Sequence, residues 1–460
     1  MHHQLFAEHA LLPDGWAQDV LLQWNVQGQW QAIQAGLAAG PQVPRATGPV
    51  LPGMPNLHSH AFQRAMAGLT EYRSHTQDSF WSWRALMYQF AAQLGPAQLE
   101  AIATALYVEM LESGFTSVCE FHYLHHDAKG QAYADAAEMS LALLRAAQRT
   151  GMGMTLLPVF YQTSGFGGSA PSQGQRRFLH STEAMLRLLE RLRPACDAQS
   201  ARLGLAPHSL RAVTPESLHE VLAGLKALDA SAPIHIHIAE QTAEVDACLA
   251  WSGQRPVAWL LDHAPVDARW CLVHATHMDA HEYQRAAGSG AVAGLCPTTE
   301  ANLGDGIFEF KTWQNHQGAW GIGSDSHIAV NPAEDLMLLE YSQRLSLRQR
   351  NVAANERQPD VAQALWQGAV AGGARAAARP IAGLAVGQQA DFIVLDAHHP
   401  ALAGLSPEQM LASHVFASSR QSAVTQVWSG GQRVVQEGRH ALHSEAMAEL
   451  VQARHDLLKT

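Results

Sequence analysis

The feature that most constrains the fold of this chain is an alternation of short apolar runs with amphipathic stretches of helical length, from about residue 50 to residue 375. Thr214 and Pro215, which open the stretch TPESLHEVLAGLKALD, are typical of a helix N-terminus. Eight such repeats predict a (β/α)8 TIM-like barrel over residues 51–375. The apolar runs are GPVLPGMPNLHSH, FTSVCEFHYLH, MGMTLLPVFYQ, ARLGLAPHSL, APIHIHIAEQ, WCLVHATHM, AVAGLCPTT and AWGIGSDSH.

The two ends of the chain follow a different pattern. Residues 18–33 alternate like a β-hairpin around a Gln-Gly turn, and residues 383–396 and 424–439 are also strand-like with glycine turns. Neither end is long enough to build a stable core alone. We therefore expect residues 1–50 and 376–460 to combine into one small β-sandwich domain.

Composition limits the classes of protein to consider. Of 460 residues, 47% are hydrophobic and 15% charged, which permits a large buried core. The sequence contains no uninterrupted apolar run of about 20 residues, so it predicts no membrane span. The N-terminus lacks the pattern of a signal peptide. Five cysteines without a CxxC pair indicate reduced thiols in a cytoplasmic protein. A net charge of −11 without a basic run argues against nucleic acid as a partner.

Polar residues recur at the carboxyl ends of the predicted strands, where barrels of this type form their sites. A single histidine on an apolar strand is more often a hydrogen-bonded core residue, but the recurrence favours a site. His235 shares a face with His237 one pleat deeper, and we expect it to be structural. The residues at the strand ends are His58, His60, Tyr123, His208, Arg211, His237, Glu240, His274 and Asp325.

Four of these residues form a candidate metal-ligand set. His58 and His60 are two positions apart on one strand and therefore share a face. Together with His237 and Asp325 they offer three imidazoles and one carboxylate. Catalytic zinc takes such ligands and leaves a position open for water. We expect a divalent metal, with Zn²⁺ favoured, although the set also suits Fe(II) or Mn(II).

The motifs HSH, HIHIAE, VHATHM and GSDSH, together with ADFIVLD near the C-terminus, resemble the deaminase branch of the amidohydrolase superfamily. The resemblance implies that His58, His60, His237 and Asp325 bind the metal. It also implies that Glu240 shuttles a proton. Binuclear members use a carboxylated lysine on the fourth strand, and ARLGLAPHSL has none, so one metal per chain is implied. Family members are commonly homodimers.

Elementary chemistry agrees with these roles. A bound metal lowers the pKa of water from about 16 to about 7, Asp325 can accept the water's proton, and Glu240 can protonate a leaving nitrogen. By the resemblance, His274 steadies the tetrahedral centre. Glu240 as a solvated helix cap and His274 as a hydrogen-bond partner of a ligand remain open alternatives.

A finer resemblance, in NLHSHAFQRAMAGLTEYR, EFHYLHHD, APHSLRAV and GSDSHIAVNPAEDL, is to the formimidoylglutamate deiminases of histidine degradation. It implies that Gln63, Tyr123, His208 and Arg211 contact a small substrate with two carboxylates, and that N-formimidoyl-L-glutamate and water yield N-formyl-L-glutamate and ammonia. The planar fork of Arg211 suits a carboxylate. The alternatives are a surface ion pair for Arg211, barrel packing for Tyr123 and a plain loop position for Gln63.

Two other functions stay open at this point. One is a metal-dependent deaminase of an aromatic heterocycle such as guanine or an adenosine derivative. The other is a non-catalytic scaffold that kept the barrel. A competent residue fills every expected ligand and proton-transfer position, and this argues against the scaffold.

Overall fold

A computed structural model of the protein describes residues 3–71, 80–418 and 422–459. Its centre is a ring of parallel strands, in two sheets that the bridges Ser59–Asp325 and Leu205–Ile234 join. The barrel predicted from the alternation is confirmed. Its strands are β5 (Met54–Ser59), β6 (Phe115–His122), β7 (Gly153–Phe160), the short β8 (Arg202–Leu203) with β9 (Ala206–Pro207), β10 (Ile234–Ile238), β11 (Trp270–His274), β12 (Val292–Leu295) and β13 (Ala319–Ile322).

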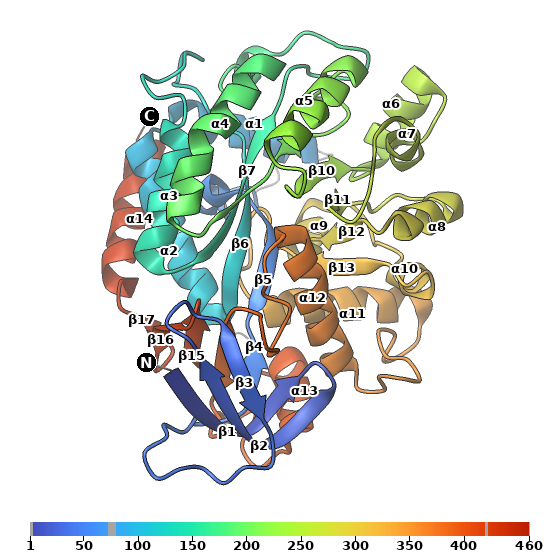
Figure 1. Cartoon of the computed structure of the whole chain (residues 1–460). Coiled ribbons are helices and arrows are strands. Elements are labelled where there is room, and N and C mark those ends of the chain that lie inside the picture. Colours follow the sequence, from blue (N-terminus) through green and yellow to red (C-terminus); the bar gives the residue numbers. More distant parts are fainter. Residues whose placement is uncertain (1–2, 72–79, 419–421, 460) are drawn as a thin grey trace.

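Helices surround the ring (Figure 1). Local sequence sets their ends. As predicted, Thr214 begins a helix, and its side chain accepts a hydrogen bond from the Ser217 N–H. Gly114 ends the helix that precedes it at a φ of 106°. The main helices are α2 (Pro96–Ser113), α3 (Glu138–Thr150), α4 (Thr182–Ala198), α5 (Pro215–Leu228), α6 (Thr242–Ser252), α7 (Pro256–His263), α8 (Ala280–Ser289), α9 (Pro297–Leu303), α10 (Phe310–Asn315), α11 (Pro332–Leu347) and α12 (Val361–Ala377).

Three further elements lie in the connections after barrel strands. The 3₁₀ helix η1 (Ala61–Met66) and the helix α1 (Phe80–Gln93) follow β5, and the 3₁₀ turn η2 (Gln173–Gln175) follows β7. Connections after barrel strands form the active-site face of such barrels. These elements therefore come close to the site.

Both termini contribute to a separate sheet of eight strands, in the order β17-β16-β15-β14-β4-β1-β2-β3. In Figure 1 its blue N-terminal strands lie below the barrel together with the red C-terminal strands. The rings of Trp24, Trp30, Phe392 and Trp428 pack against one another between them. The strands are β1 (His3–Leu12), β2 (Gly15–Trp24), β3 (Trp30–Gln34), β4 (Val50–Pro52), β14 (Phe392–Leu395), β15 (Val424–Ser429), β16 (Gln432–Gln436) and β17 (Arg439–His440).

Two C-terminal helices return to the barrel. α13 (Pro407–Phe416) packs on α11 and α12, and α14 (His443–Leu458) packs on α2. All five cysteines are buried and free, as expected for reduced thiols. Within the described part of the chain, no helix combines the length and apolarity that a membrane crossing requires.

Candidate active site

Three imidazoles converge at the carboxyl end of the barrel strands. The Nε2 atom of His58, on β5, lies 3.1 Å from that of His60 and 3.0 Å from that of His237 at β10. All three side chains are buried. The spacing is close to the edge of about 3.3 Å expected for nitrogen ligands around a tetrahedral zinc ion.

The tautomers of these histidines distinguish a metal site from a hydrogen-bond network. The Nδ1 of His60 lies 2.8 Å from the Phe121 carbonyl and that of His237 lies 3.1 Å from the His208 carbonyl, so both Nδ1 atoms donate. Their Nε2 atoms therefore carry lone pairs, and His58 Nε2 can donate to only one of them. Lone pairs aimed at one point, with Nδ1–H fixed by backbone oxygens, are typical of metal-ligand histidines.

The carboxylate of Asp325, also predicted from the sequence as a ligand, lies beside these imidazoles. Its Oδ1 lies 3.5 Å from His58 Nε2 and 3.4 Å from His60 Nε2. Burial acts to raise the pKa of Asp325, but the adjacent His58, His274 and His60 outweigh it and hold that pKa below its usual value. Burial also lowers the pKa of His58 to about 3. The group therefore presents neutral imidazoles and an ionised carboxylate, the forms that bind metals.

The backbone is strained where it presents these side chains. Asp325 has a φ of 47°, His274 a φ of 65° and Ala239, next to Glu240, a φ of 50°. Positive φ in residues other than glycine costs about 1–3 kcal/mol each and concentrates at functional sites. The strain falls at the ends of β10, β11 and β13, where the polar residues turn into the barrel mouth.

His274 lies between three carboxylates. Its Nδ1 is 3.2 Å from Glu300 Oε1, and its Nε2 is 3.8 Å from both Glu240 Oε1 and Asp325 Oδ2. Burial acts against a charged ring, but Glu240, Glu300 and Asp325 outweigh it and raise the pKa of His274 to about 10. Burial raises the pKa of Glu240, although His274 and Arg211 oppose it. A cationic imidazolium thus stands beside an acid that can carry a proton.

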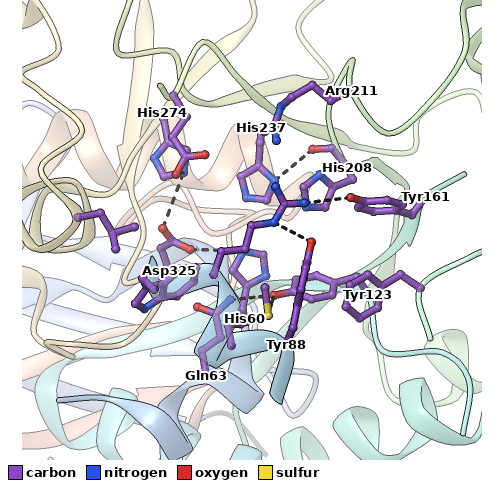
Figure 2. Close-up of a pocket in the computed structure, with 16 residues that line it drawn as sticks. His60, Gln63, Tyr88, Tyr123, Tyr161, His208, Arg211, His237, His274 and Asp325 are labelled. Carbon is purple, nitrogen blue, oxygen red and sulfur yellow. Dashed lines mark hydrogen bonds and ion pairs between the residues drawn. The ribbon is translucent and has the colours of Figure 1, made fainter. Parts of the chain in front are cut away.

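The other sequence-predicted residues surround one cavity, of about 560 Å³ with its open mouth included, above this group. Gln63, Tyr123, His208 and Arg211 all line it, and Figure 2 shows them around the labelled His60, His237, His274 and Asp325. Gln63 Nε2 donates to the Tyr123 hydroxyl at 2.8 Å. His235, in contrast, donates from Nε2 to the Ala376 carbonyl at 2.8 Å and is buried away from the cavity, as predicted for a structural residue.

Arg211 is the first cation of the cavity. Its Nη2 lies 3.9 Å from Glu244 Oε2, and its buried Nε has no hydrogen-bond partner among the described residues. Glu244 Oε2 also accepts the Glu240 N–H at 3.2 Å. A largely buried guanidinium with unused donors is prepared to receive a carboxylate.

Sequence reasoning missed a second cation, Arg84 on α1, which also lines the cavity. Its Nε donates to the Tyr88 hydroxyl at 2.7 Å and its Nη2 to the Tyr161 hydroxyl at 3.3 Å. Figure 2 labels the two tyrosines, Tyr88 and Tyr161, and dashed lines end at their hydroxyls. No local signal identifies Arg84, because it lies inside a helix and follows no strand end.

Comparison with known proteins agrees with this geometry. The profile of the amidohydrolase family matches residues 50–434. The chain belongs to the amidohydrolase family. A second profile, described as the N-terminal domain of formimidoylglutamate deiminase HutF, matches residues 2–45.

Individual family members support the assignment. A formimidoylglutamate deiminase of Pseudomonas aeruginosa is 51% identical over 454 residues, which cover 99% of each chain. An 8-oxoguanine deaminase of the same organism is 30% identical and covers 75% of this chain and 73% of its own. The crystal structure of an amidohydrolase from Brucella melitensis is 49% identical, has a TM-score of 0.94, and covers 99% of this chain and 100% of its own.

As a member of this family the protein is a hydrolase that acts on carbon–nitrogen bonds. Members of the family typically bind a divalent metal, and the cluster of His58, His60 and His237 provides a site for one. The donor set fits such an ion, since the imidazoles are neutral and two have their Nδ1 atoms fixed by backbone carbonyls.

Proposed function

We propose that this protein is a metal-dependent deiminase that converts N-formimidoyl-L-glutamate and water to N-formyl-L-glutamate and ammonia in histidine degradation. The formimidoylglutamate deiminase of P. aeruginosa, 51% identical over 99% of both chains, supports this substrate. The match of residues 2–45 to the N-terminal domain of such enzymes supports it independently of the barrel.

The observation that carries the proposal is a pair of arginines in one cavity with Glu240 and the metal-ligand group. Arg84 and Arg211 line the same space and come from different connections of the barrel. N-formimidoyl-L-glutamate carries two carboxylates, and arginine binds a carboxylate through a planar fork. An aromatic heterocycle such as guanine offers no charge that would require two guanidinium groups.

The proposed metal ligands are His58, His60, His237 and Asp325, and we propose one ion per chain, with Zn²⁺ favoured. Residues 202–207, at the fourth strand position, contain no lysine, and this supports a single ion. A divalent metal held by these ligands would supply Lewis acidity and lower the pKa of a water molecule to about 7.

The chain's own residues would then move the protons. Asp325, ionised because its pKa is low, accepts the proton of the attacking water. Glu240 delivers a proton to the nitrogen that leaves, since its raised pKa allows it to act as a neutral acid. His274, cationic at neutral pH, stabilises the negative oxygen of the tetrahedral intermediate.

The remaining contacts would orient the substrate. Arg84 and Arg211 hold the glutamate end away from the metal ligands, and Gln63, Tyr123 and His208 add hydrogen bonds along the wall of the cavity. The terminal nitrogen of the formimidoyl group then lies beside Glu240. Proton delivery requires a distance of about 3 Å, or one bridging water. The terminal nitrogen therefore leaves as ammonia, and glutamate keeps its nitrogen.

Proton NMR of the reaction in H₂¹⁸O, with mass spectrometry of the product, tests this proposal. Ammonia and N-formyl-L-glutamate with solvent oxygen in the formyl group are expected. Formamide and free glutamate would refute the proposed orientation of the substrate. Ammonia release from guanine or adenosine derivatives, without release from N-formimidoyl-L-glutamate, would favour the heterocycle deaminase.

We further propose a homodimer in the cytoplasm, organised as a catalytic barrel (residues 51–375) and a composite β domain (residues 1–50 and 376–460). The homodimer is supported by the commonly dimeric state of the family. The division of the chain into two domains is supported by the eight-stranded sheet built from both termini. Light scattering after size-exclusion chromatography tests the dimer, with a monomeric mass as the contradicting result. Cell fractionation tests the location.

A further inference from the structure

The substrate arginine Arg84 depends on the placement of α1. This helix lines the cavity with Arg84, Met87 and Tyr88. It precedes α2 in the connection from β5 to β6, which therefore contains two helices. Arg84 can meet a substrate carboxylate only if α1 is held at a fixed position. The structure must therefore contain groups that fix it.

A buried guanidinium lies at the C-terminal end of α1. Arg177, only 1% exposed, donates through Nη1 to the Ala91 carbonyl and through Nη2 to the Leu94 carbonyl at 2.7 Å. Its Nε donates to the His126 carbonyl at 2.8 Å. Among the described residues, no carboxylate lies within ion-pair distance of Arg177.

These contacts match what the end of a helix lacks. The last carbonyls of an α-helix have no partner within the helix, and the end carries a partial negative charge. Ala91 lies in the last turn of α1 and Leu94 follows directly, so Arg177 supplies both hydrogen bonds and a positive charge. Burial lowers the pKa of Arg177, but arginine keeps its charge at any physiological pH.

The backbone of Arg177 is itself fixed to the barrel. Its carbonyl accepts the N–H groups of His125 and His126 at 3.1 Å each, in the segment after β6. The guanidinium thus bridges a strand end of the barrel and the end of α1. Because a planar fork has its donors in fixed directions, this bridge sets both distance and orientation.

The same short segment also contacts the cavity side of α1. Gln175 Nε2 donates to the Tyr161 hydroxyl at 2.6 Å and lies 3.4 Å from the Tyr88 hydroxyl. These are the two hydroxyls that receive the hydrogen bonds of Arg84. Residues 175–177 therefore reach α1 at its C-terminal end and at the turn that bears Arg84.

We propose that Arg177 is a positioning residue that docks the end of α1 and thereby sets Arg84 at the carboxylate of the substrate. This inference rests on the proposed function, because it assumes a substrate with two carboxylates. Arg177 does not line the cavity, so its effect on binding passes through Arg84.

Arg177→Met, Arg84→Met and the double variant test the proposal, with Arg176→Met as the matched control. Arg176 is the adjacent, partly exposed arginine, which donates to the Ala128 and Gln173 carbonyls and, among the described residues, has no hydrogen bond or ion pair with α1. Arg177→Met is expected to raise KM for N-formimidoyl-L-glutamate about tenfold or more while kcat changes by less than about threefold. In the double variant, the KM penalty is expected to be no larger than in Arg84→Met alone, since residues acting through one contact are not additive.

Hydrogen exchange gives a second measurement without substrate. In Arg177→Met the amides of residues 84–93 are expected to exchange faster while those of the other helices keep their rates. Arg177→Lys keeps a positive charge at the helix end, so its effect is expected to be smaller than that of Arg177→Met, but its ammonium cannot reach three diverging carbonyls. It serves if Arg177→Met does not accumulate as folded protein.

Unchanged KM and unchanged exchange in α1 would overturn the role of Arg177, as would additive KM penalties in the double variant. Absence of ammonia release by the unmodified enzyme would instead overturn the proposed function. The exchange rates of α1 would still decide whether Arg177 docks the helix.

Discussion

Replacing Arg211 by methionine separates a substrate-binding role from a structural one. Methionine keeps an apolar chain of similar length and removes the guanidinium. Among the described residues, the Arg211 guanidinium makes one long contact, 3.9 Å to Glu244, and its Nε has no partner. The guanidinium is therefore largely available to a substrate carboxylate.

The expected loss of substrate binding follows from the largely buried position of the Arg211 side chain. Removing one member of a buried, hydrogen-bonded charge pair costs about 2–5 kcal/mol of binding. At about 1.4 kcal/mol for each factor of ten, kcat/KM for N-formimidoyl-L-glutamate should fall roughly 30-fold to several thousandfold. Glu244 is also left without its cation, and this destabilises the folded protein. The double variant Arg211→Met with Glu244→Gln is expected to restore thermal stability but not kcat/KM.

A coupled assay of ammonia release measures kcat and KM, and elemental analysis measures bound metal. We expect a raised KM, unchanged metal content, and a smaller effect on an analogue that lacks one carboxylate. An Arg211→Met enzyme with normal kcat/KM would refute the reasoning and leave Arg211 as a structural partner of Glu244.

Three further outcomes are expected. His237→Ala should lose metal and activity together, while the unmodified protein should contain one metal per chain by elemental analysis; two ions per chain would contradict the single-metal proposal. Glu240→Gln should keep its metal and bind substrate in calorimetry, yet lose about 10² or more in kcat, because the proton carrier is gone; near-normal kcat would exclude the shuttle. Burial raises the pKa of Asp335 to about 8. Between about pH 4 and pH 8 the folded protein therefore keeps a proton on this carboxyl group, whereas the unfolded chain has released it. Asp335 thus lowers the free energy of unfolding as the pH rises from about 4 to about 8. Asp335→Asn has a side-chain oxygen that can still accept from Thr298. The thermal stability of this variant relative to the unmodified protein should therefore rise between about pH 4 and pH 8, and a constant difference would contradict this sign.

Most of the barrel was predictable because its signals are local. The eight apolar runs became the eight strand positions, and Thr214 and Gly114 mark helix ends through hydrogen bonds to residues a few positions away. The strand-end rule placed His237 and Asp325 on one rim without any knowledge of distances. The structure places both beside His58, whose Nε2 lies 3.0 Å from His237 Nε2 and 3.5 Å from Asp325 Oδ1.

Arg84 escaped prediction for a physical reason. A residue within a helix can point toward any neighbour, and its direction depends on how that helix docks. For α1 the docking involves Arg177, some 90 positions further along the chain, and the hydroxyls of Tyr88 and Tyr161. The same holds for Glu300, which fixes His274 from the helix after β12.

The sequence by itself determined the barrel, the pairing of both termini and the residue types that would bind a metal, since hydrophobic period, turn residues and strand-end positions act over short distances along the chain. Only the tertiary structure decided that Arg84 and Arg211 line one cavity, that three imidazoles converge on one point, and that His274 is surrounded by carboxylates. Those properties depend on directions and distances between side chains far apart in sequence. The pKa values of these side chains then shift because the folded structure buries them beside one another.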